Sequence, residues 1–447
     1  VWDARWIPTF DYGYGYPIFR YYMPLVHWIN GLFTAVTRSA LLALQLSVFL
    51  WMCVGAVGTY AAAQALWSRV RDRDLRGWQP GLLAAIGWIL ATYPSTNIFV
   101  RGTLSEYAAS TMLSWICFFA ILALGRNASP SLRDVPAYAG AALAVAIGLA
   151  SHNFGGLMCL GFALMTIPFV FFIARESTTP SPPLRPLARA VPWLGSIAVG
   201  LLLTFFLWFP ALMERDLVIV ESITKGMFFY RDHFVTLGHF FPITYWGYGG
   251  SFAGPTDGLP RHIGFTGFFA LMSFFLALMM AFGPGAGRGR VISKVGAVIL
   301  FATAAGLYLA HFSSDAIWRL IPIMQKGQFP WRMLSIPAFG FCLLLPAAVL
   351  AFERTAESRR VVWGMALFAV LASSVAYWDV LGHTRVIPQY QPENWARTNI
   401  TSADLDEYDP IWSLDRPHPP LAAGQTGAPA NVTIDVEERT GAKLVAT

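Results

Sequence analysis

The side chains best suited to chemistry gather in four short stretches of the sequence, and the first is its opening. Residues 1–28 carry two carboxylates, Asp3 and Asp11, beside the cations Arg5 and Arg20. A carboxylate can accept a proton or hold a metal ion, and an arginine can bind a phosphate with two hydrogen bonds. The alternative is an aromatic belt at a membrane interface that contains ordinary ion pairs. The residues alone leave both interpretations open.

The second and third stretches lie at the ends of apolar runs. Arg101 and Glu106 flank a short polar turn, and His152 stands between Ser151 and Asn153. Arg101 and Glu106 suit either a binding site or a helix-terminal salt bridge. A histidine can act as an acid, a base or a phosphate donor, but a lone histidine is more often a satisfied structural group.

The fourth stretch, residues 325–332, comes directly before another apolar run. It contains the cations Lys326 and Arg332, together with Pro330 and Trp331. Cations at the mouth of a membrane protein favour an anionic ligand, and snorkelling to lipid phosphates is the alternative.

Other common catalytic signatures are missing from the sequence. It has no P-loop, no GxSxG elbow, no dinucleotide fingerprint in context and no HExxH pair, so an ATP-driven pump is not expected. The four cysteines stand far apart in apolar runs, without metal-ligand spacing, and are expected to be buried small hydrophobic residues. They are Cys53, Cys117, Cys159 and Cys342.

The composition decides what kind of element must position these groups. Of the 447 residues, 56% are hydrophobic and only 13% are charged. A soluble globular protein has about 25% charged residues, so we expect an all-α polytopic membrane protein. The formal net charge of +6 is spread over short loops between apolar runs, so it does not indicate a nucleic-acid partner.

Ten runs are long and apolar enough to predict spanning helices. They lie at about 40–66, 80–98, 107–125, 136–152, 154–174, 193–213, 262–283, 291–311, 333–352 and 361–378. The fourth and fifth runs meet at His152 and are expected to form a tight hairpin. Because the sequence begins with Val1 rather than methionine, we expect a further helix before it, which makes the count ten to eleven.

The basic residues predict the orientation of these helices. Five loops totalling 58 residues hold 15 of the 31 lysines and arginines. They are the loops at 68–78, 126–135, 175–192, 284–294 and 353–360. The positive-inside rule places them in the cytoplasm. All four chemically suited stretches then face the exterior.

We therefore expect three regions. Residues 1–39 form an exterior first loop with interfacial helices, 40–378 form the transmembrane domain, and 379–447 form an exterior C-terminal region. The last region is rich in proline and polar residues, and the alternating pattern at 431–438 predicts a strand. The sequence stops inside this pattern, so we expect the β-rich region to be incomplete.

Together these stretches resemble a known group of membrane proteins. The Asp3-Ala-Arg5-Trp6 segment is similar to the acid-x-Arg-aromatic signature of GT-C type glycosyltransferases. The longer run from Gly15 to Leu25, with the other three polar stretches, resembles the bacterial integral membrane proteins labelled 6-pyruvoyl-tetrahydropterin synthase-related, or YfhO-like. The label does not imply pterin chemistry. The resemblance covers about residues 1–378.

The resemblance implies a bundle that transfers sugar from a polyprenyl-phosphate donor at the exterior face of the bacterial cytoplasmic (inner) membrane. The implied catalytic acids are Asp3, Asp11 and Glu106. The implied substrate-binding residues are Arg5, Trp6, Tyr16, Arg101, His152, Lys326 and Arg332. Many GT-C enzymes have two adjacent acids in the first loop, whereas Ala4 follows Asp3 here. A divalent metal ion, Mg²⁺ or Mn²⁺, is therefore an open expectation.

Two other functions stay open at this point. The chain could be a non-catalytic scaffold or accessory subunit that binds other membrane subunits, which the missing second acid favours. It could also be a lipid or polysaccharide transporter. The scarcity of ionisable residues in the middle of the predicted spans speaks against transport.

Overall fold

The computed structural model describes residues 5–7, 16–69, 77–125, 129–175, 184–218, 224–251, 257–282 and 286–352. It also describes residues 360, 363, 364, 366–368 and 371, together with 436–439 and 444–446. The chain divides into two compact units. The smaller comprises Val1–Pro24, Phe205–Phe229 and Gly382–Thr447, and the larger comprises Leu25–Thr204 and Tyr230–Leu381.

The smaller unit contains short elements. A bridge joins Ile7 to Tyr16, and the segment then enters helix α1. The elements are α1 (Ile18–Tyr21), α10 (Phe205–Met213), the 3₁₀ helices η4 (Arg215–Leu217) and η6 (Gly226–Phe228), and strands β1 (Val436–Arg439) and β2 (Leu444–Ala446). The two strands pair antiparallel. Strand β1 overlaps the predicted strand at 431–438, but most of 379–447 lies outside the described residues, so a β-rich region stays a prediction.

The larger unit is a bundle of helices. Its first half contains α2 (Leu25–Thr37), α3 (Ala40–Trp67), α4 (Gln79–Ile89), α5 (Thr92–Phe99), α6 (Leu104–Leu124), η3 (Leu132–Asp134), α7 (Val135–Ser151), α8 (Asn153–Arg175) and α9 (Leu184–Leu203). Helices α7 and α8 meet at His152, so the predicted hairpin is confirmed.

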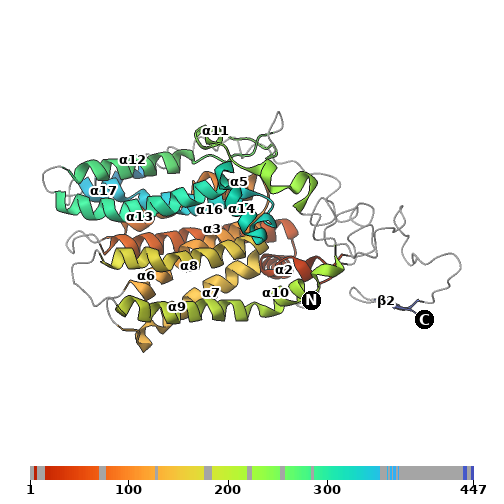
Figure 1. Ribbon diagram of the computed structural model, residues 1–447. Coiled ribbons are helices and arrows are strands. Elements are labelled where there is room, and N and C mark those ends of the chain that lie inside the picture. The colour runs from red at the N-terminus through yellow and green to blue at the C-terminus, as the bar shows by residue number, and fades with distance from the viewer. Residues whose placement is uncertain are drawn as a thin grey trace. The chain divides into compact units, whose positions relative to one another are not determined.

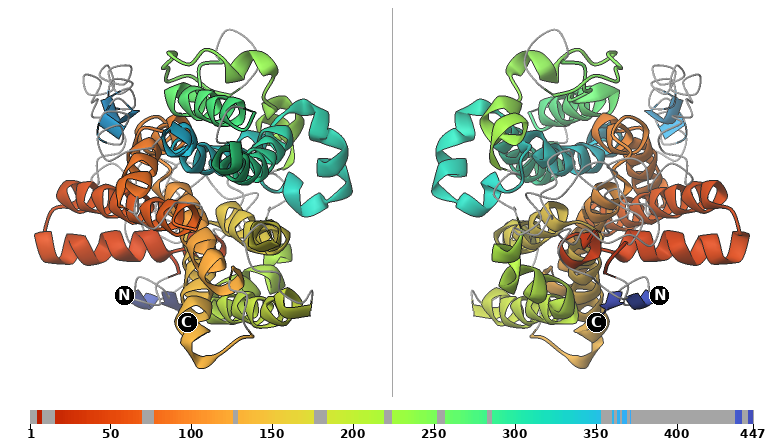
Figure 2. Two further views of the ribbon diagram at one scale, coloured as in Figure 1. Left: turned by 90° about the vertical axis from the view of Figure 1, so that its left-hand side faces the viewer. Right: turned by 90° about the vertical axis from the view of Figure 1, so that its right-hand side faces the viewer.

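The second half of the larger unit begins with short helices and ends with long apolar ones. It contains η7 (Tyr230–His233), α11 (Leu237–Phe240), α12 (Gly264–Met280), α13 (Ala286–Ala310), η8 (Phe312–Ser314), α14 (Asp315–Leu320), α15 (Pro322–Gln325), η9 (Pro330–Leu334), α16 (Ser335–Leu344) and α17 (Ala347–Phe352). The long helices run with roughly aligned axes (Figure 1), and Figure 2 views the bundle nearly along them.

Several of the described helices are long and apolar, as the composition of the sequence predicts. By length and composition, five described helices can cross a membrane, or up to seven if each of two bent pairs forms one span. The five are Ala40–Trp67, Leu104–Leu124, Leu132–Ser151, Gly289–Ala310 and Pro330–Phe352. Three shorter apolar helices lie within Leu25–Thr37, Asn153–Pro168 and Gly264–Met280. The predicted span at 361–378 lies mostly outside the described residues, so the count of ten to eleven stays a prediction.

Helix α6 forms the centre of the bundle, and its side chains are buried along most of its length. It packs closely against α3 because Gly55 and Gly58 leave room for neighbouring side chains; a Cβ on Gly58 would collide with Ser114 and Trp115. Three of the four cysteines, Cys117, Cys159 and Cys342, are buried as free thiols, as expected, whereas Cys53 is only partly buried. Glu106 lies in the first turn of α6.

Candidate functional site

Four of the residues singled out from the sequence meet around one carboxylate at one end of the bundle. Glu106 is 1% exposed and lies in the first turn of α6. Its Oε2 lies 2.8 Å from Nη1 of Arg101 and 3.1 Å from Nε of Arg332. The Tyr93 hydroxyl donates a hydrogen bond of 2.6 Å to Oε1 of Glu106. His152 lies close enough to interact electrostatically with Glu106 and both arginines. We call Tyr93, Arg101, Glu106, His152 and Arg332 the Glu106 cluster.

The turn between α5 and α6 places Arg101. Gly102 has φ of +64°, a conformation that glycine adopts without strain. Backbone bonds from the turn to the end of α5 fix it, including Thr103 N–H to Asn97 O over 2.8 Å. The buried Asn97 side chain also accepts a hydrogen bond of 2.6 Å from Nη1 of Arg101. The sequence therefore builds a turn that points one guanidinium at Glu106.

Arg332 comes from a constrained segment between α15 and α16. Gln328 has φ of +60°, which non-glycine residues rarely adopt and which costs on the order of 1 kcal/mol or more. A Cβ on Gly327 would collide with the ring of Phe154, so the segment approaches the start of α8 closely. Nη1 of Arg332 donates to the Gly327 carbonyl over 2.8 Å. Backbone strain of this kind is common at functional sites.

His152 joins the cluster from the α7–α8 hairpin. Its Nδ1 accepts a hydrogen bond of 3.0 Å from the Gly155 N–H, so the ring caps the start of α8. Burial, and then the charge of Arg332, lower the pKa of His152 to about 3. His152 is therefore neutral at physiological pH and adds no charge to the cluster.

Aromatic rings form one wall of the cluster. The guanidinium of Arg101 lies 4.3 Å from the ring centroid of Trp331, and that of Arg332 lies 4.9 Å from the centroid of Phe329. The rings of Phe329 and Trp331 stack with centroids 4.9 Å apart. Stacking of this kind leaves a guanidinium free to turn its N–H edge toward an oxyanion.

Among the five described side chains of the Glu106 cluster, the cations outnumber the anion. Two guanidiniums face one carboxylate, and the histidine is neutral, so the formal charge of the cluster is +1. Both arginine side chains are only 11% exposed. Two guanidiniums held side by side can bind a phosphate through charge-assisted hydrogen bonds.

A divalent metal ion does not fit the described part of this cluster. Its one carboxylate already faces two cations, and among the described residues no group of three or more His, Cys, Asp and Glu could hold a metal. The open expectation of Mg²⁺ or Mn²⁺ concerned Asp3 and Asp11, and both lie outside the described residues.

The remaining candidates from the opening stretch belong to the smaller unit. Arg5 donates through Nη2 to the Phe206 carbonyl over 3.3 Å, and Trp6 is partly exposed. Tyr16 is fully buried. Arg20 forms an ion pair with Glu214, a residue that the sequence had not indicated.

Lys326 is exposed, and no ion pair is found for it among the described residues, although it lies in the same segment as Arg332. It therefore stands outside the Glu106 cluster.

A separate polar group lies in the chain between α11 and α12. Nε2 of His239 lies 3.0 Å from Oδ2 of Asp257, and Asp257 also pairs with Arg261. Together with Tyr245 and His262, these residues line a cavity of about 220 Å³. The sequence reasoning did not identify it, because its members are single polar residues spread over a long loop.

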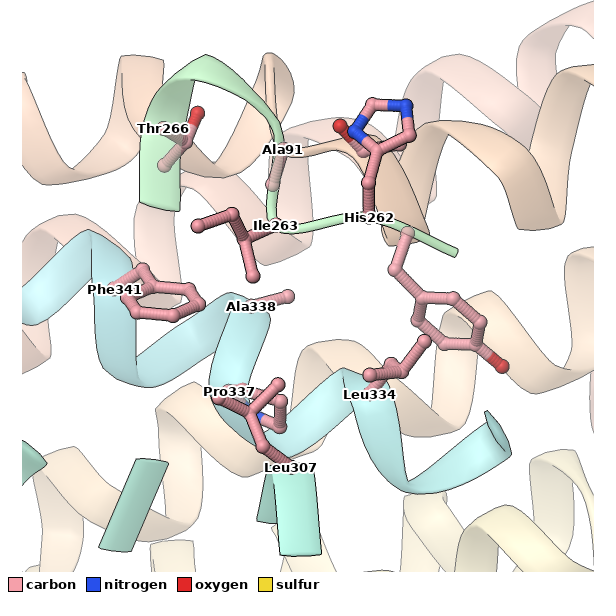
Figure 3. Close-up of a pocket in the computed structure, with 11 residues that line it drawn as sticks. Ala91, His262, Ile263, Thr266, Leu307, Leu334, Pro337, Ala338 and Phe341 are labelled. Atoms are coloured by element: carbon pink, nitrogen blue, oxygen red, sulfur yellow. The ribbon is translucent and has the colours of Figure 1, made fainter. Parts of the chain in front are cut away.

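A small cavity lies beside the Glu106 cluster, at the break between α4 and α5. Figure 3 shows Ile263, Leu334, Pro337 and Phe341 around it, with His262 at its edge. Its volume is about 20 Å³, enough for one water molecule but not for a substrate. The break exists because Ala91 is extended, and α4 and α5 meet at 43°. This bend brings Tyr93 toward Glu106.

Sequence reasoning missed two partners that matter. Tyr93 belongs to the cluster, and its signal was the polar run at 92–97 inside an otherwise apolar segment. At the other end of α7, buried Arg189 donates to the Ala123 carbonyl over 2.6 Å and pairs with Asp134 at 3.2 Å. The sequence indicates the segments of Arg189 and Asp134 only as basic loops that set the orientation in the membrane.

Comparison with known proteins adds no family: no protein-family model matches the chain, and no curated protein matches it significantly.

Proposed function

We propose that this protein is a membrane enzyme of the GT-C type, which moves a sugar from a polyprenyl-phosphate donor to an exterior glycan, lipid or protein. The observation that carries the proposal is the meeting of Arg101, Arg332 and His152 around Glu106 at the end of spanning helices. A lipid-linked phosphate would present its anion at such a place.

In this proposal the arginines bind the donor phosphate. When the bond between sugar and phosphate breaks, negative charge grows on the phosphate oxygens, and fixed guanidiniums stabilise it. Glu106 is a poor base, because two guanidiniums and the Tyr93 hydroxyl already occupy its oxygens. We therefore assign Glu106 to positioning the two arginines.

The resemblance assigns the general base to Asp3, with Asp11 as a second acid. A carboxylate there would take the proton of the acceptor hydroxyl while that oxygen attacks the anomeric carbon. The resemblance also assigns sugar stacking to Trp6 and Tyr16 and phosphate contacts to Arg5 and Lys326. These roles depend on the resemblance alone.

A second candidate function is a non-catalytic scaffold with the same fold. One observation favours it: each oxygen of Glu106 already has a partner within the protein. A network in which each carboxylate oxygen is already satisfied can also serve only to hold α5, α6 and η9 together.

The test is sugar transfer by the purified full chain in lipid nanodiscs, supplied with a panel of polyprenyl-phosphate sugars and membrane acceptors. We expect transfer by the wild type, a loss of at least a hundredfold in Arg332→Gln and partial rescue in Arg332→Lys. Arg319→Gln is the matched control, because Arg319 is exposed and pairs with Asp315 away from the cluster. Asp3→Asn should abolish transfer but retain donor binding.

Two results would overturn the proposal. One is an absence of transfer by a folded wild type with every donor, combined with stable copurification of other membrane subunits, which supports the scaffold. The other is equal transfer by Arg332→Gln and wild type, which would remove the cluster from the reaction.

A further inference from the structure

A further cavity among the described residues lies between the apolar helices of the larger unit. Its volume is about 490 Å³, and it is lined by residues of α6, α8, α13 and α16. Along α13 it extends from Lys294 to Leu309. At 1.5 Å per residue this distance is about 22 Å, most of the thickness of a bilayer's hydrocarbon core.

The lining of this cavity has almost nothing to offer a polar ligand. Its walls are formed mostly by apolar side chains, some small, such as Ala302 and Ala305, and some large, such as Phe339. Its two threonines are already satisfied, because the hydroxyl of Thr166 donates to Ala163 O over 2.7 Å and that of Thr303 donates to Ile299 O over 2.8 Å. The cavity therefore fits a hydrocarbon chain.

The two ends of the cavity differ in charge. Lys294 lines one end, and the exposed Arg290 lies one helical turn before it on the same face of α13. At the other end the nearest cation in sequence is Arg332, one turn before the lining residue Ile336, but Arg332 is directed at Glu106. An anionic head group is therefore favoured at the Lys294 end, where basic pockets between spanning helices bind such lipids.

We propose that this cavity is a binding site for one anionic membrane phospholipid, with an acyl chain between α8 and α13 and its phosphate at Lys294. The positive-inside rule assigns this end to the cytoplasmic leaflet, opposite the face proposed for sugar transfer. The site is independent of the proposed function, since a scaffold with this fold would keep it.

The experiment is native mass spectrometry of the full chain after delipidation and titration with phosphatidylglycerol or phosphatidylcholine of the same chains. We expect the wild type to retain one phosphatidylglycerol in preference to phosphatidylcholine. Ala302→Trp fills the cavity and should lower retention at least tenfold. Ala304→Trp is the matched control, because Ala304 is exposed on the same helix and does not line the cavity.

The head group is tested separately. Lys294→Gln should reduce the preference for phosphatidylglycerol about fivefold and leave phosphatidylcholine retention unchanged. Arg133→Gln, which removes an exposed arginine outside the cavity, should behave like the wild type.

Equal retention by Ala302→Trp and Ala304→Trp would overturn the site. Retention of a polyprenyl phosphate that depends on Ala302 but not on Lys294 would overturn the phospholipid assignment. It would indicate that the cavity binds a lipid whose phosphate lies at the Arg332 end. Either result would leave the transfer assay unaffected, so the two proposals fail separately.

Discussion

Nε of Arg332 lies 3.1 Å from Oε2 of Glu106, so the entry of one spanning segment is paired with the first turn of another. The pair is buried, and the carboxylate also receives Arg101 and Tyr93. Removing one partner of a buried ion pair leaves an uncompensated charge, which is more damaging than the loss of an exposed pair.

Replacement of Glu106 measures this effect. Glu106→Gln removes the charge that faces two buried guanidiniums, and we expect a loss of about 3–5 kcal/mol of stability, seen as a lower midpoint of thermal unfolding in detergent. Glu214→Gln is the matched control, because its partner Arg20 is 32% exposed and its loss should cost about 1 kcal/mol or less. Equal effects of the two substitutions would contradict the account of the cluster.

Acid should destabilise the protein through His152. Its folded pKa of about 3 lies below the ordinary value of 6.5, because burial disfavours the charged ring. The contribution of a group with a lowered folded pKa is complete above about pH 6.5 and is lost as the pH falls toward 3, at up to about 1.4 kcal/mol per pH unit.

His152→Asn separates this titration from the helix cap. Asparagine keeps an acceptor for the Gly155 N–H but does not titrate. Unfolding midpoints measured from pH 7 to pH 4 should therefore fall less steeply in the variant than in the wild type. Identical slopes would show that His152 does not titrate on unfolding.

The turn before α6 gives a prediction about backbone strain. Gly102→Ala meets no side chain but must adopt φ of +64°, so we expect a loss of about 1 kcal/mol and weaker function of Arg101. Gly31→Ala, in the exposed interior of α2, also meets nothing and should instead stabilise by about 0.5–1 kcal/mol. Thermal unfolding of the two variants checks the sign, and a stabilising Gly102→Ala would refute it.

The orientation in the membrane can be measured directly. Cysteines introduced at the exposed positions Arg133 and Lys326 should react with a membrane-impermeant maleimide from opposite sides, Lys326→Cys from outside whole cells and Arg133→Cys only after lysis. A background in which the four native cysteines are replaced gives a clean signal. The reverse pattern would place the Glu106 cluster on the cytoplasmic side.

Local sequence patterns predicted that the chain is mostly helical and apolar, because apolar runs of about twenty residues and the polar break at His152 are short-range signals. They did not predict that the runs at 80–98 and 193–213 are each divided into two bent helices. They also indicated Arg101, Glu106, His152 and Arg332 as candidates. The partners could not be predicted, since which helix faces which depends on packing between distant segments. Tyr93 reaches Glu106 only because the chain breaks at Ala91 and bends.

Asp3 and Asp11 illustrate the other limit. Their proposed roles come from a resemblance carried by short motifs, and both lie outside the described residues. The Glu106 cluster stands without them, because its charges and distances belong to one compact unit.

The most direct test of the central claim is equilibrium binding of a polyprenyl monophosphate to the full chain in nanodiscs, for the wild type, Arg101→Gln, Arg332→Gln and the control Arg319→Gln. We expect saturable binding by the wild type and the control. Each cluster variant should weaken binding at least tenfold, since a charge-assisted contact to phosphate is worth about 1.5–3 kcal/mol. Equal affinity in all four proteins would contradict the proposal that the Glu106 cluster binds a lipid phosphate.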